Sequence, residues 1–222
     1  MRYNQFCPIA KASELLGDKW TFLVLRELLT GGHRFNEFLR GLGHISPSLL
    51  SARLKQLEEE GIIIRQTVKG QRGYEYYLTE AGKEVMPIIQ ELGKWGMKWA
   101  RDQINDAELD IELLMLYLVR SIKPKYLIGD ETIIHFKFNN LKKLQDWWII
   151  VNNHDIDVCL ADPGKEVDVW FNTDVRTMME VWMGDQSYQT AIKNKKLKIV
   201  GPASLTKNVS KWLNNSDFAA TA

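Results

Sequence analysis

Four hydrogen-bonding side chains gather on one side of a short amphipathic segment in the first half of the chain. Leucines stand at positions 50, 54 and 57, and away from them lie Ser46, Ser48, Ser51 and Lys55. Apolar residues at i, i+4 and i+7 predict a helix with one buried stripe. Hydroxyl and ammonium groups on the other side can bind phosphate oxygens or base edges, and the DNA major groove admits one such helix. The segment is therefore a candidate DNA-reading helix.

The start and end of this helix are marked in the sequence. Ser46 is a good N-cap, and Pro47 suits the first helical position, where its missing N–H costs nothing. We expect Ser46 to act as this cap, with a phosphate contact as an addition, rather than to read a base. Asn36–Leu42 predicts a preceding short helix that Gly41 and Gly43 break, and Gly61 ends the reading helix. Two short helices joined by a tight turn predict a helix-turn-helix.

Two strand-like runs follow this motif. Ile62–Val68 is rich in β-branched residues and alternates, and Tyr74–Leu78 returns after a glycine-flanked turn, which is typical of a hairpin. Its tip carries Lys69, Gln71 and Arg72, which are candidates for phosphate contacts. A helix-turn-helix followed by a hairpin with a basic tip predicts a winged helix.

Two arginines near the motif also belong to the candidate interface. Arg34, before the first motif helix, is a candidate phosphate contact. Arg53, within the reading helix, has two open alternatives, a phosphate or an internal carboxylate. Asp18 is interpreted as the N-cap of an earlier helix, Lys19–Leu29. The acidic run Glu58–Glu60 is interpreted as the solvated end of the reading helix, distal from DNA.

A long predicted helix, Ala81–Gln103, carries a wide apolar stripe. This stripe is more apolar surface than a winged helix alone can cover, so we interpret it as a dimerisation surface. The alternative, that the helix packs only on its own domain, stays open. The proposed dimerisation residues recur at spacings of three and four and are Val85, Ile88, Ile89, Leu92, Trp95 and Trp99.

Length and composition indicate an ordinary globular protein. The chain has 222 residues, of which 45% are hydrophobic and 26% charged, enough for one large or two ordinary domains. Residues 1–100 carry 14 Lys and Arg against 11 Asp and Glu, a mildly basic balance that allows DNA binding. No apolar run suits a membrane span or a signal peptide, and Cys7 and Cys159 stand far apart. We therefore expect a cytoplasmic protein without a disulfide framework.

A polar junction at residues 105–108 marks the predicted boundary between domains 1–104 and 105–222. A helix, Leu109–Ile122, follows it, and Asp174 and Ser187 are expected to cap two later helices that end at Met183 and Asn194. Strands followed by helices in a separate segment predict an α+β domain. The predicted strands are Ile133–Phe138, Trp147–Val151, Val158–Leu160, Val167–Phe171 and Leu197–Val200, and the last predicted helix is Ala203–Leu213.

Three segments of the first half carry a resemblance to a known family, and they are CPIAKASELLGDKW, LRELLTGGHRFNEFLRGLGHISPSLLSARLKQLEEEGII and GYEYYLTEAGKEV. They resemble the HxlR-type branch of winged helix regulators, which is related to the MarR group. The resemblance implies a homodimer that binds a palindromic operator. It places the second motif helix in the major groove and the wing on the backbone or minor groove.

The second half, around VDVWFNTDVRTMMEVWMGDQSYQTAIKNKKLKIVGPASLTKNVSKWL, is similar to sterol-carrier-protein-like domains that follow such regulators in some bacterial proteins. Related domains enclose an apolar tunnel, so the resemblance implies a lipid-like or other hydrophobic effector. Several large apolar residues can line such a cavity, and they are equally typical of a plain core. These candidates are Phe136, Phe171, Met178, Met179, Trp182, Leu205 and Trp212.

Cys7 is a candidate redox residue, because some of the regulators that the chain resembles use a cysteine at this place as a thiol switch. A reactive thiol needs an accessible, electropositive setting. Lys11, one helical turn later, can supply the positive charge. The alternative is a buried structural cysteine.

The leading hypothesis is an α+β, homodimeric transcription regulator that binds an operator in double-stranded DNA and is modulated by an apolar small molecule. The second hypothesis is a lipid or hydrophobic small-molecule carrier whose winged helix serves protein association. HExxH, CxxC, P-loop and GxGxxG motifs are absent from the sequence. We therefore expect neither a metal, a cofactor nor an enzyme activity.

Overall fold

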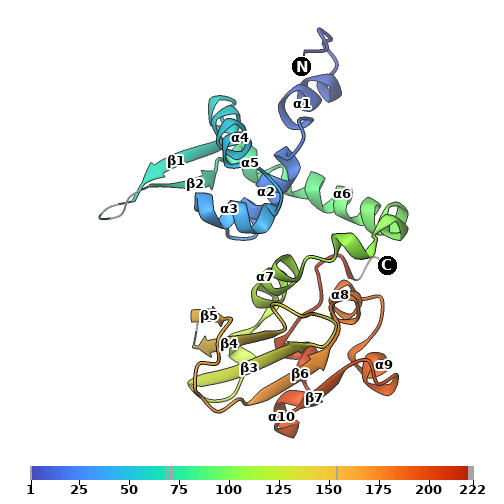
Figure 1. Ribbon diagram of the computed structural model, residues 1–222. Helices are drawn as coiled ribbons and strands as arrows, with labels where there is room; N and C mark the ends of the chain where they lie inside the picture. Colours follow the sequence, from blue (N-terminus) through green and yellow to red (C-terminus); the bar gives the residue numbers. More distant parts are fainter. Residues whose placement is uncertain (1, 69, 71–72, 154, 220–222) are drawn as a thin grey trace. The chain divides into compact units, whose positions relative to one another are not determined.

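The computed structural model describes residues 2–68, 70, 73–153 and 155–219. The chain divides into two compact units, Met1–Gly93 and Lys94–Ala222, and each has its own apolar core (Figure 1). The two units meet within a helix, whereas the sequence placed a boundary after residue 104. The predicted domain limits 1–104 and 105–222 stay predictions.

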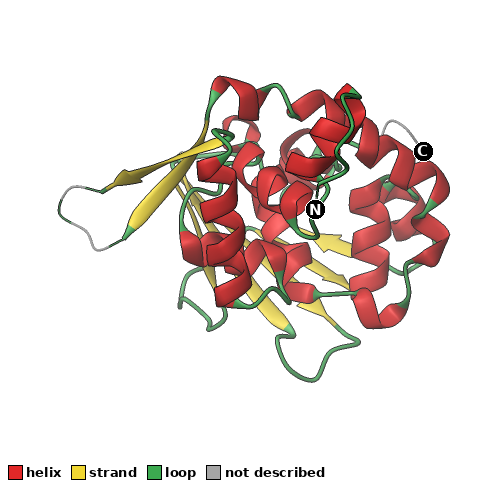
Figure 2. Cartoon of the chain, turned by 90° about the horizontal axis from the view of Figure 1, so that it is seen from above, coloured by secondary structure: helices red, strands yellow, loops and turns green. Residues whose placement is uncertain are grey.

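The first unit is a winged helix-turn-helix, as the sequence predicts. Its hairpin projects away from the helices of the unit (Figures 1 and 2). The two strands are antiparallel, with Ile63 opposite Leu78 and Thr67 opposite Tyr74. In chain order the elements are α1 (Pro8–Leu16), α2 (Thr21–Leu29), α3 (Phe35–Leu42), α4 (Pro47–Glu59), β1 (Ile63–Thr67), β2 (Tyr74–Leu78), α5 (Glu80–Lys83) and α6 (Met86–Trp99), which continues into the second unit.

The core of the first unit forms around α4. Leu50, Leu54 and Leu57 are at most 1% exposed, and they belong to one cluster with Val24 of α2 and Phe38 of α3. Full burial of a leucine contributes about 1.5–3 kcal/mol, so three of them hold α4 firmly against the unit. The predicted apolar stripe of this helix is confirmed.

The predicted helix Ala81–Gln103 is wrong in its extent. The structure breaks it into α5, α6 and the 3-10 helix η1 (Arg101–Gln103). Pro87 lies at the second position of α6. A proline has no N–H and its ring clashes with the preceding turn, so it is tolerated only near a helix start. The apolar periodicity continues across this break, which is why the sequence pattern did not reveal it.

The second unit is an α+β fold with a five-stranded sheet. The strand order is β5-β4-β3-β6-β7, in which β3 and β6 are parallel and the other pairs antiparallel. In chain order, after η1, come η2 (Asp106–Glu108), α7 (Ile111–Ser121), η3 (Pro124–Tyr126), β3 (Glu131–Phe138), β4 (Asp146–Asn152), β5 (Asp155–Cys159), β6 (Val169–Thr173), α8 (Val175–Met183), α9 (Tyr188–Lys193), β7 (Lys198–Val200), α10 (Ala203–Thr206) and α11 (Val209–Trp212).

Alternation along the strands gives this sheet one strongly apolar face. In β6, Val169 and Phe171 are buried, whereas Trp170 between them is 45% exposed. Met115 of α7 and Met178 of α8 pack against the buried side in one core cluster. Among the described residues, no helix is both long enough and apolar enough to cross a membrane.

The last predicted helix, Ala203–Leu213, is also wrong in its extent, because α10 and α11 are separate. Asn208 lies between them, and its side-chain Nδ2 donates a hydrogen bond to the carbonyl of Ser204 at 2.9 Å. Asparagine side chains compete for backbone groups in this way and so interrupt helices. By contrast, Asp174 and Ser187 cap α8 and α9 as predicted.

A buried carboxylate lies where α2 and α3 meet. Glu27 is fully buried and accepts a hydrogen bond from Arg26 Nη2 at 2.8 Å. The same guanidinium nitrogen donates to the carbonyl of Gly41 at 2.9 Å. A Cβ at position 41 would stand 2.0 Å from Oε2 of Glu27. The two helices therefore approach this closely only because residue 41 has no side chain.

We expect Gly41→Ala to lower the free energy of unfolding by about 1–3 kcal/mol, because the buried carboxylate must move to admit the methyl group. Gly96→Ala is the matched control, since Gly96 lies in α6 with no atom within 4 Å of the added Cβ. That change should be neutral or stabilising, as alanine is the better helix former. Urea unfolding measures the free energy of unfolding of both variants. Equal values would contradict the close approach of α2 and α3 at Gly41.

Candidate functional site

The outer face of α4 is exposed and carries small and basic groups. Ser46 caps the helix, because its Oγ accepts a hydrogen bond from the backbone N–H of Leu49 at 3.3 Å. Ser48, Ser51 and Lys55 are exposed on the side away from the buried leucines. The cap role predicted for Ser46 is confirmed, while the DNA contacts of all four residues stay predictions.

Arg53 points into the protein from the same helix. Its side chain is only 12% exposed, and Nη1 lies 2.5 Å from Oδ2 of Asp18. Arg53 Nη1 also donates to Gln56 Oε1, and Gln56 Nε2 donates to the same Asp18 oxygen at 3.0 Å. Of the two alternatives for Arg53, the structure shows the second, in which its guanidinium pairs with an internal carboxylate. The three side chains tie α4 to the segment before α2.

The role predicted for Asp18 is wrong. It does not cap the helix Lys19–Leu29, since α2 begins at Thr21 and the N-cap position belongs to Trp20 at φ +80°. Its carboxylate accepts from Gln56 and Arg53 instead. These hydrogen bonds, with that from Gln56 the larger cause, hold the pKa of Asp18 below its ordinary value. The tertiary partner was not visible in the sequence, because Asp18 and Arg53 stand 35 residues apart.

Arg34 lies beside β2 of the hairpin, where it forms an antiparallel bridge with Glu75. Its Nε and Nη2 donate to Oε1 of Glu75 at 3.0 and 2.9 Å, and the hydroxyl of Tyr77 donates to the other oxygen at 2.6 Å. These bonds, with that from Tyr77 first, lower the pKa of Glu75. Arg34 is 46% exposed, so one face of its guanidinium still reaches solvent. The wing-tip candidates Lys69, Gln71 and Arg72 lie outside the described residues.

The predicted dimerisation residues fall into two groups. Val85 is only 6% exposed, and Val85 and Ile89 pack into the core of the first unit. The remaining four lie on one exposed stripe of α6, with exposures of 50% for Ile88, 46% for Leu92, 60% for Trp95 and 63% for Trp99. An apolar stripe of this size on one helix is available for a partner surface.

The predicted ligand residues also divide. Five of them are at most 2% exposed and belong to the core of the second unit, and these are Phe136, Phe171, Met178, Leu205 and Trp212. Met179 and Trp182, both on α8, line one pocket, and Phe171 also borders a second one beside β6 and β7. Most of the predicted ligand residues are therefore core residues, and the two on α8 line the pocket described next.

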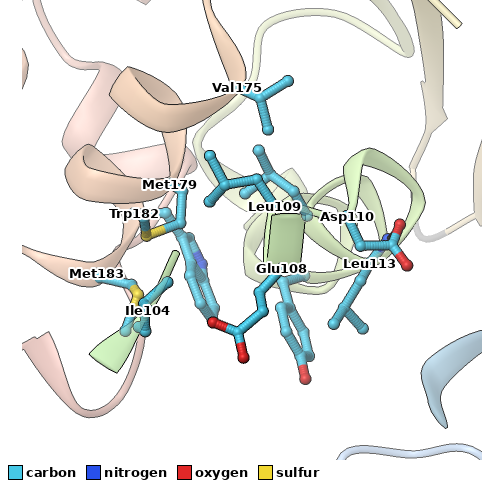
Figure 3. A pocket seen from close by; sticks show the side chains of 11 residues that line it. Ile104, Glu108, Leu109, Asp110, Leu113, Val175, Met179, Trp182 and Met183 are labelled. Atoms are coloured by element: carbon cyan, nitrogen blue, oxygen red, sulfur yellow. Dashed lines mark hydrogen bonds between the residues drawn. The ribbon is translucent and has the colours of Figure 1, made fainter. Parts of the chain in front are cut away.

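This pocket has a volume of about 290 Å³ and lies within the second unit (Figure 3). Sequence reasoning missed most of its wall, which comes from the polar junction and the helix after it. A signal was present, because Leu109, Leu113 and Tyr117 recur at a spacing of four. The lining residues are Ile104, Glu108, Leu109, Asp110, Leu113, Leu114, Tyr117, Val175, Met179, Trp182 and Met183.

Cys7 is a free thiol that is partly buried at the N-cap position of α1. Lys11 is one turn away, but its ammonium group bonds Glu14 at 2.9 Å. The positive charge that was expected to favour the thiolate is therefore shared with a carboxylate, and the redox role stays a prediction. Within the described part of the chain, no three His, Cys, Asp or Glu side chains form a group suited to a metal ion.

Comparison with known proteins matches the two halves separately. A family model described as HxlR-like helix-turn-helix matches residues 15–104. A second model, described as the SCP-2 sterol transfer family, matches residues 126–214. The two matched ranges coincide closely with the two segments whose sequences suggested distinct roles.

Curated relatives match the first half. The HTH-type transcriptional regulator YvaP of Bacillus subtilis (strain 168), itself uncharacterised, is 38% identical over 101 residues, which are 45% of this chain and 94% of YvaP. A similar regulator of Synechocystis, sll1512, is 38% identical over 107 residues, 48% of this chain and 79% of the relative. The reduced form of the B. subtilis transcriptional regulator YodB is 31% identical, with a TM-score of 0.36, and covers 43% of this chain and 95% of YodB.

We expect Asp18→Asn to destabilise the protein at neutral pH and to lose this effect in acid. A carboxyl whose pKa is lowered on folding stabilises the fold above its unfolded pKa of about 4, and this contribution is lost as pH falls through the folded pKa. Urea unfolding of wild type and variant at pH 7 and pH 3 measures it. Glu60→Gln, at the exposed end of α4, is the control and should change little at either pH. If the two proteins differed in their free energy of unfolding by the same amount at pH 7 and pH 3, the stabilising role of the ionised Asp18 would be contradicted.

Proposed function

We propose, from the premise that this chain belongs to the HxlR-like helix-turn-helix family of transcriptional regulators, that it binds a palindromic operator as a homodimer. The observation that supports this most directly is the exposed face of α4. In this proposal the second unit, which carries the SCP-2 sterol transfer domain, binds an apolar small molecule that changes the affinity for DNA.

The proposed contacts follow from the orientation of α4. The buried leucines turn Ser48 and Ser51 outward, where their hydroxyls can reach base edges in the major groove. Serine accepts and donates, so each hydroxyl alone discriminates weakly between bases. Lys55 is 76% exposed and its pair with Glu59 is 3.4 Å apart, a surface pair that contributes little and leaves the ammonium able to bind a phosphate. Arg34 and the basic wing residues complete the proposed backbone contacts.

The proposed homodimer uses the exposed stripe of α6. Ile88, Leu92, Trp95 and Trp99 follow one another at helical spacing, and pairing with a second copy would remove this apolar surface from water. A symmetric dimer presents two reading helices, and their separation must match two half-sites one helical turn of DNA apart. The palindromic operator is the counterpart of that two-fold symmetry.

The proposed effector response uses the continuity of the chain. The helix α6 begins in the first unit and ends in the second, so a change at its end can alter the pairing that spaces the reading helices. A ligand shifts this equilibrium only if it binds one arrangement more tightly than the other. A ligand with equal affinity for both arrangements would leave DNA binding unchanged.

We expect the wild type to shift a fragment of its own promoter in a gel at low salt, and Lys55→Ala to weaken binding to specific and non-specific duplexes alike. The slope of log K against log salt is negative, and loss of one phosphate contact reduces its magnitude by about 0.9. Lys83→Ala is the control, because Lys83 lies on α5 and pairs with Glu80. Absence of any shift by the wild type would contradict the function. Lost discrimination at one base pair, with the slope unchanged, would contradict the phosphate role of Lys55.

We expect the double substitution Leu92→Glu and Trp95→Glu to convert the dimer to monomers, raising the dissociation constant by roughly a hundredfold or more. Two carboxylates at the centre of an apolar interface are buried without partners. Gln90→Glu is the control, since Gln90 is exposed on the other side of α6. Sedimentation equilibrium measures all three proteins. A wild type that stays monomeric, or a double variant that stays dimeric, would contradict this surface.

A further inference from the structure

We infer that the pocket of the second unit takes an organic cation with an apolar body, such as a lipophilic quaternary ammonium ion. This inference rests on the proposed effector role and names the chemical class of the effector. Among the described residues that line the pocket, Glu108 and Asp110 are acidic and none is Lys, Arg or His. The remaining lining residues are apolar or aromatic, so the pocket combines an apolar interior with negative charge.

The two carboxylates are held by backbone donors and not by basic side chains. Glu108 Oε2 accepts from the N–H of Asn105 at 2.9 Å, in the capping box of η2. Asp110 Oδ1 accepts from the N–H groups of Glu112 and Leu113 at 2.9 and 3.1 Å, as the N-cap of α7. Figure 3 shows the carboxylate of Glu108 and that of Asp110 carried on different sides of Leu109. Backbone hydrogen bonds therefore hold both carboxylates in position before any ligand arrives.

The nearby arginines do not compensate these charges. Arg176 pairs with Asp106, and Arg101 pairs with Asp185, so each guanidinium already has a carboxylate of its own. Glu108 is exposed, and its carboxylate is available to a cationic ligand. An anionic ligand, such as a fatty acid, would instead be repelled by the like charges of these carboxylates.

An aromatic pair provides the second cation-binding element. The rings of Tyr117 and Trp182 stack with centroids 4.9 Å apart and an interplanar angle of 3°. The indole Nε1 of Trp182 donates to Ser121 Oγ at 2.9 Å, which satisfies its polar group and fixes the ring. The negative π-face of tryptophan attracts cations, and alkylammonium ligands are commonly recognised in this way.

The apolar remainder of the wall accounts for the body of the ligand. Leu109, Leu113, Val175 and Met179 line the pocket, and methionine adapts to irregular ligand shapes. A volume of about 290 Å³ is at the small end for ligand pockets, which suits a compact aromatic or short-chain amine. The pocket thus combines acidic groups that favour a cation with apolar walls that favour an apolar body.

The test uses two probes that share an apolar body and differ in charge, namely the (naphthalen-1-yl)methyl-trimethylammonium ion and naphthalen-1-ylacetate. Each is titrated into the full chain, without DNA and at low salt, and binding is measured by calorimetry. We expect the cation to bind at least about tenfold more tightly than the anion. Equal or tighter binding of the anion would overturn the inference, as would no binding of either probe at millimolar concentration.

Glu108→Gln assigns the charge to a residue. The amide oxygen can still accept from the N–H of Asn105, so the cap is retained and only the charge is lost. We expect the affinity for the cation to fall about fivefold and that for the anion not to fall. Glu112→Gln is the matched control, because Glu112 is exposed in the first turn of α7 and does not line the pocket. Equal losses in both variants would overturn the role of Glu108.

The ligand measurement is independent of DNA binding, so the two proposals fail separately. If the cation binds with the expected charge preference but the protein shifts no promoter fragment, the proposed ligand class is supported and the proposed regulatory function is contradicted. If the promoter fragment is shifted and neither probe binds, the proposed regulatory function is supported and the proposed ligand class is contradicted. Binding of the cation that also changes the gel shift supports both.

Discussion

The burial of one leucine stripe is the constraint on which the candidate interface depends. Leu50, Leu54 and Leu57 leave α4 a single low-energy orientation, since rotating the helix would expose them to water at about 1.5–3 kcal/mol each. The Arg53–Asp18–Gln56 group adds a polar attachment at the edge of this stripe. The exposed serines and Lys55 are a consequence of what is buried behind them. Arg53 is thereby engaged inside the protein, and the outer face of α4 carries Ser48, Ser51 and Lys55.

The two units use apolar surface in different ways. In the first unit a core forms around α4, and exposed apolar side chains remain on α6 and elsewhere, among them Phe6 and Ile9. In the second unit the sheet and its helices form a larger core, and a pocket remains beside α7 and α8. An exposed stripe suits a second protein surface, whereas a pocket of this size suits a small molecule. One helix, α6, begins in the first unit and ends in the second.

The sequence predicted the elements well wherever local chemistry decided them. The Ser46–Pro47 start, the caps at Asp174 and Ser187, and the alternating strands all depend on neighbours within a few residues, and the structure contains each of them. Helix extents were less predictable. Periodicity alone could not show that Pro87 and Asn208 interrupt two apolar stripes, because the apolar residues on both sides of each break keep the helical spacing.

Local patterns along the chain were enough to predict the winged helix, the α+β second unit and the outward set of small and basic side chains on α4, because periodicity, capping and turn chemistry are local. Which polar residues were already engaged depended on long-range contacts. Asp18 pairs with Arg53 rather than capping a helix, and Arg34 binds Glu75 across 41 residues. The tertiary structure also separated core from pocket, placing Phe136 inside and Trp182 at the cavity. Those outcomes depend on which distant segments pack together, and no spacing along the chain encodes that.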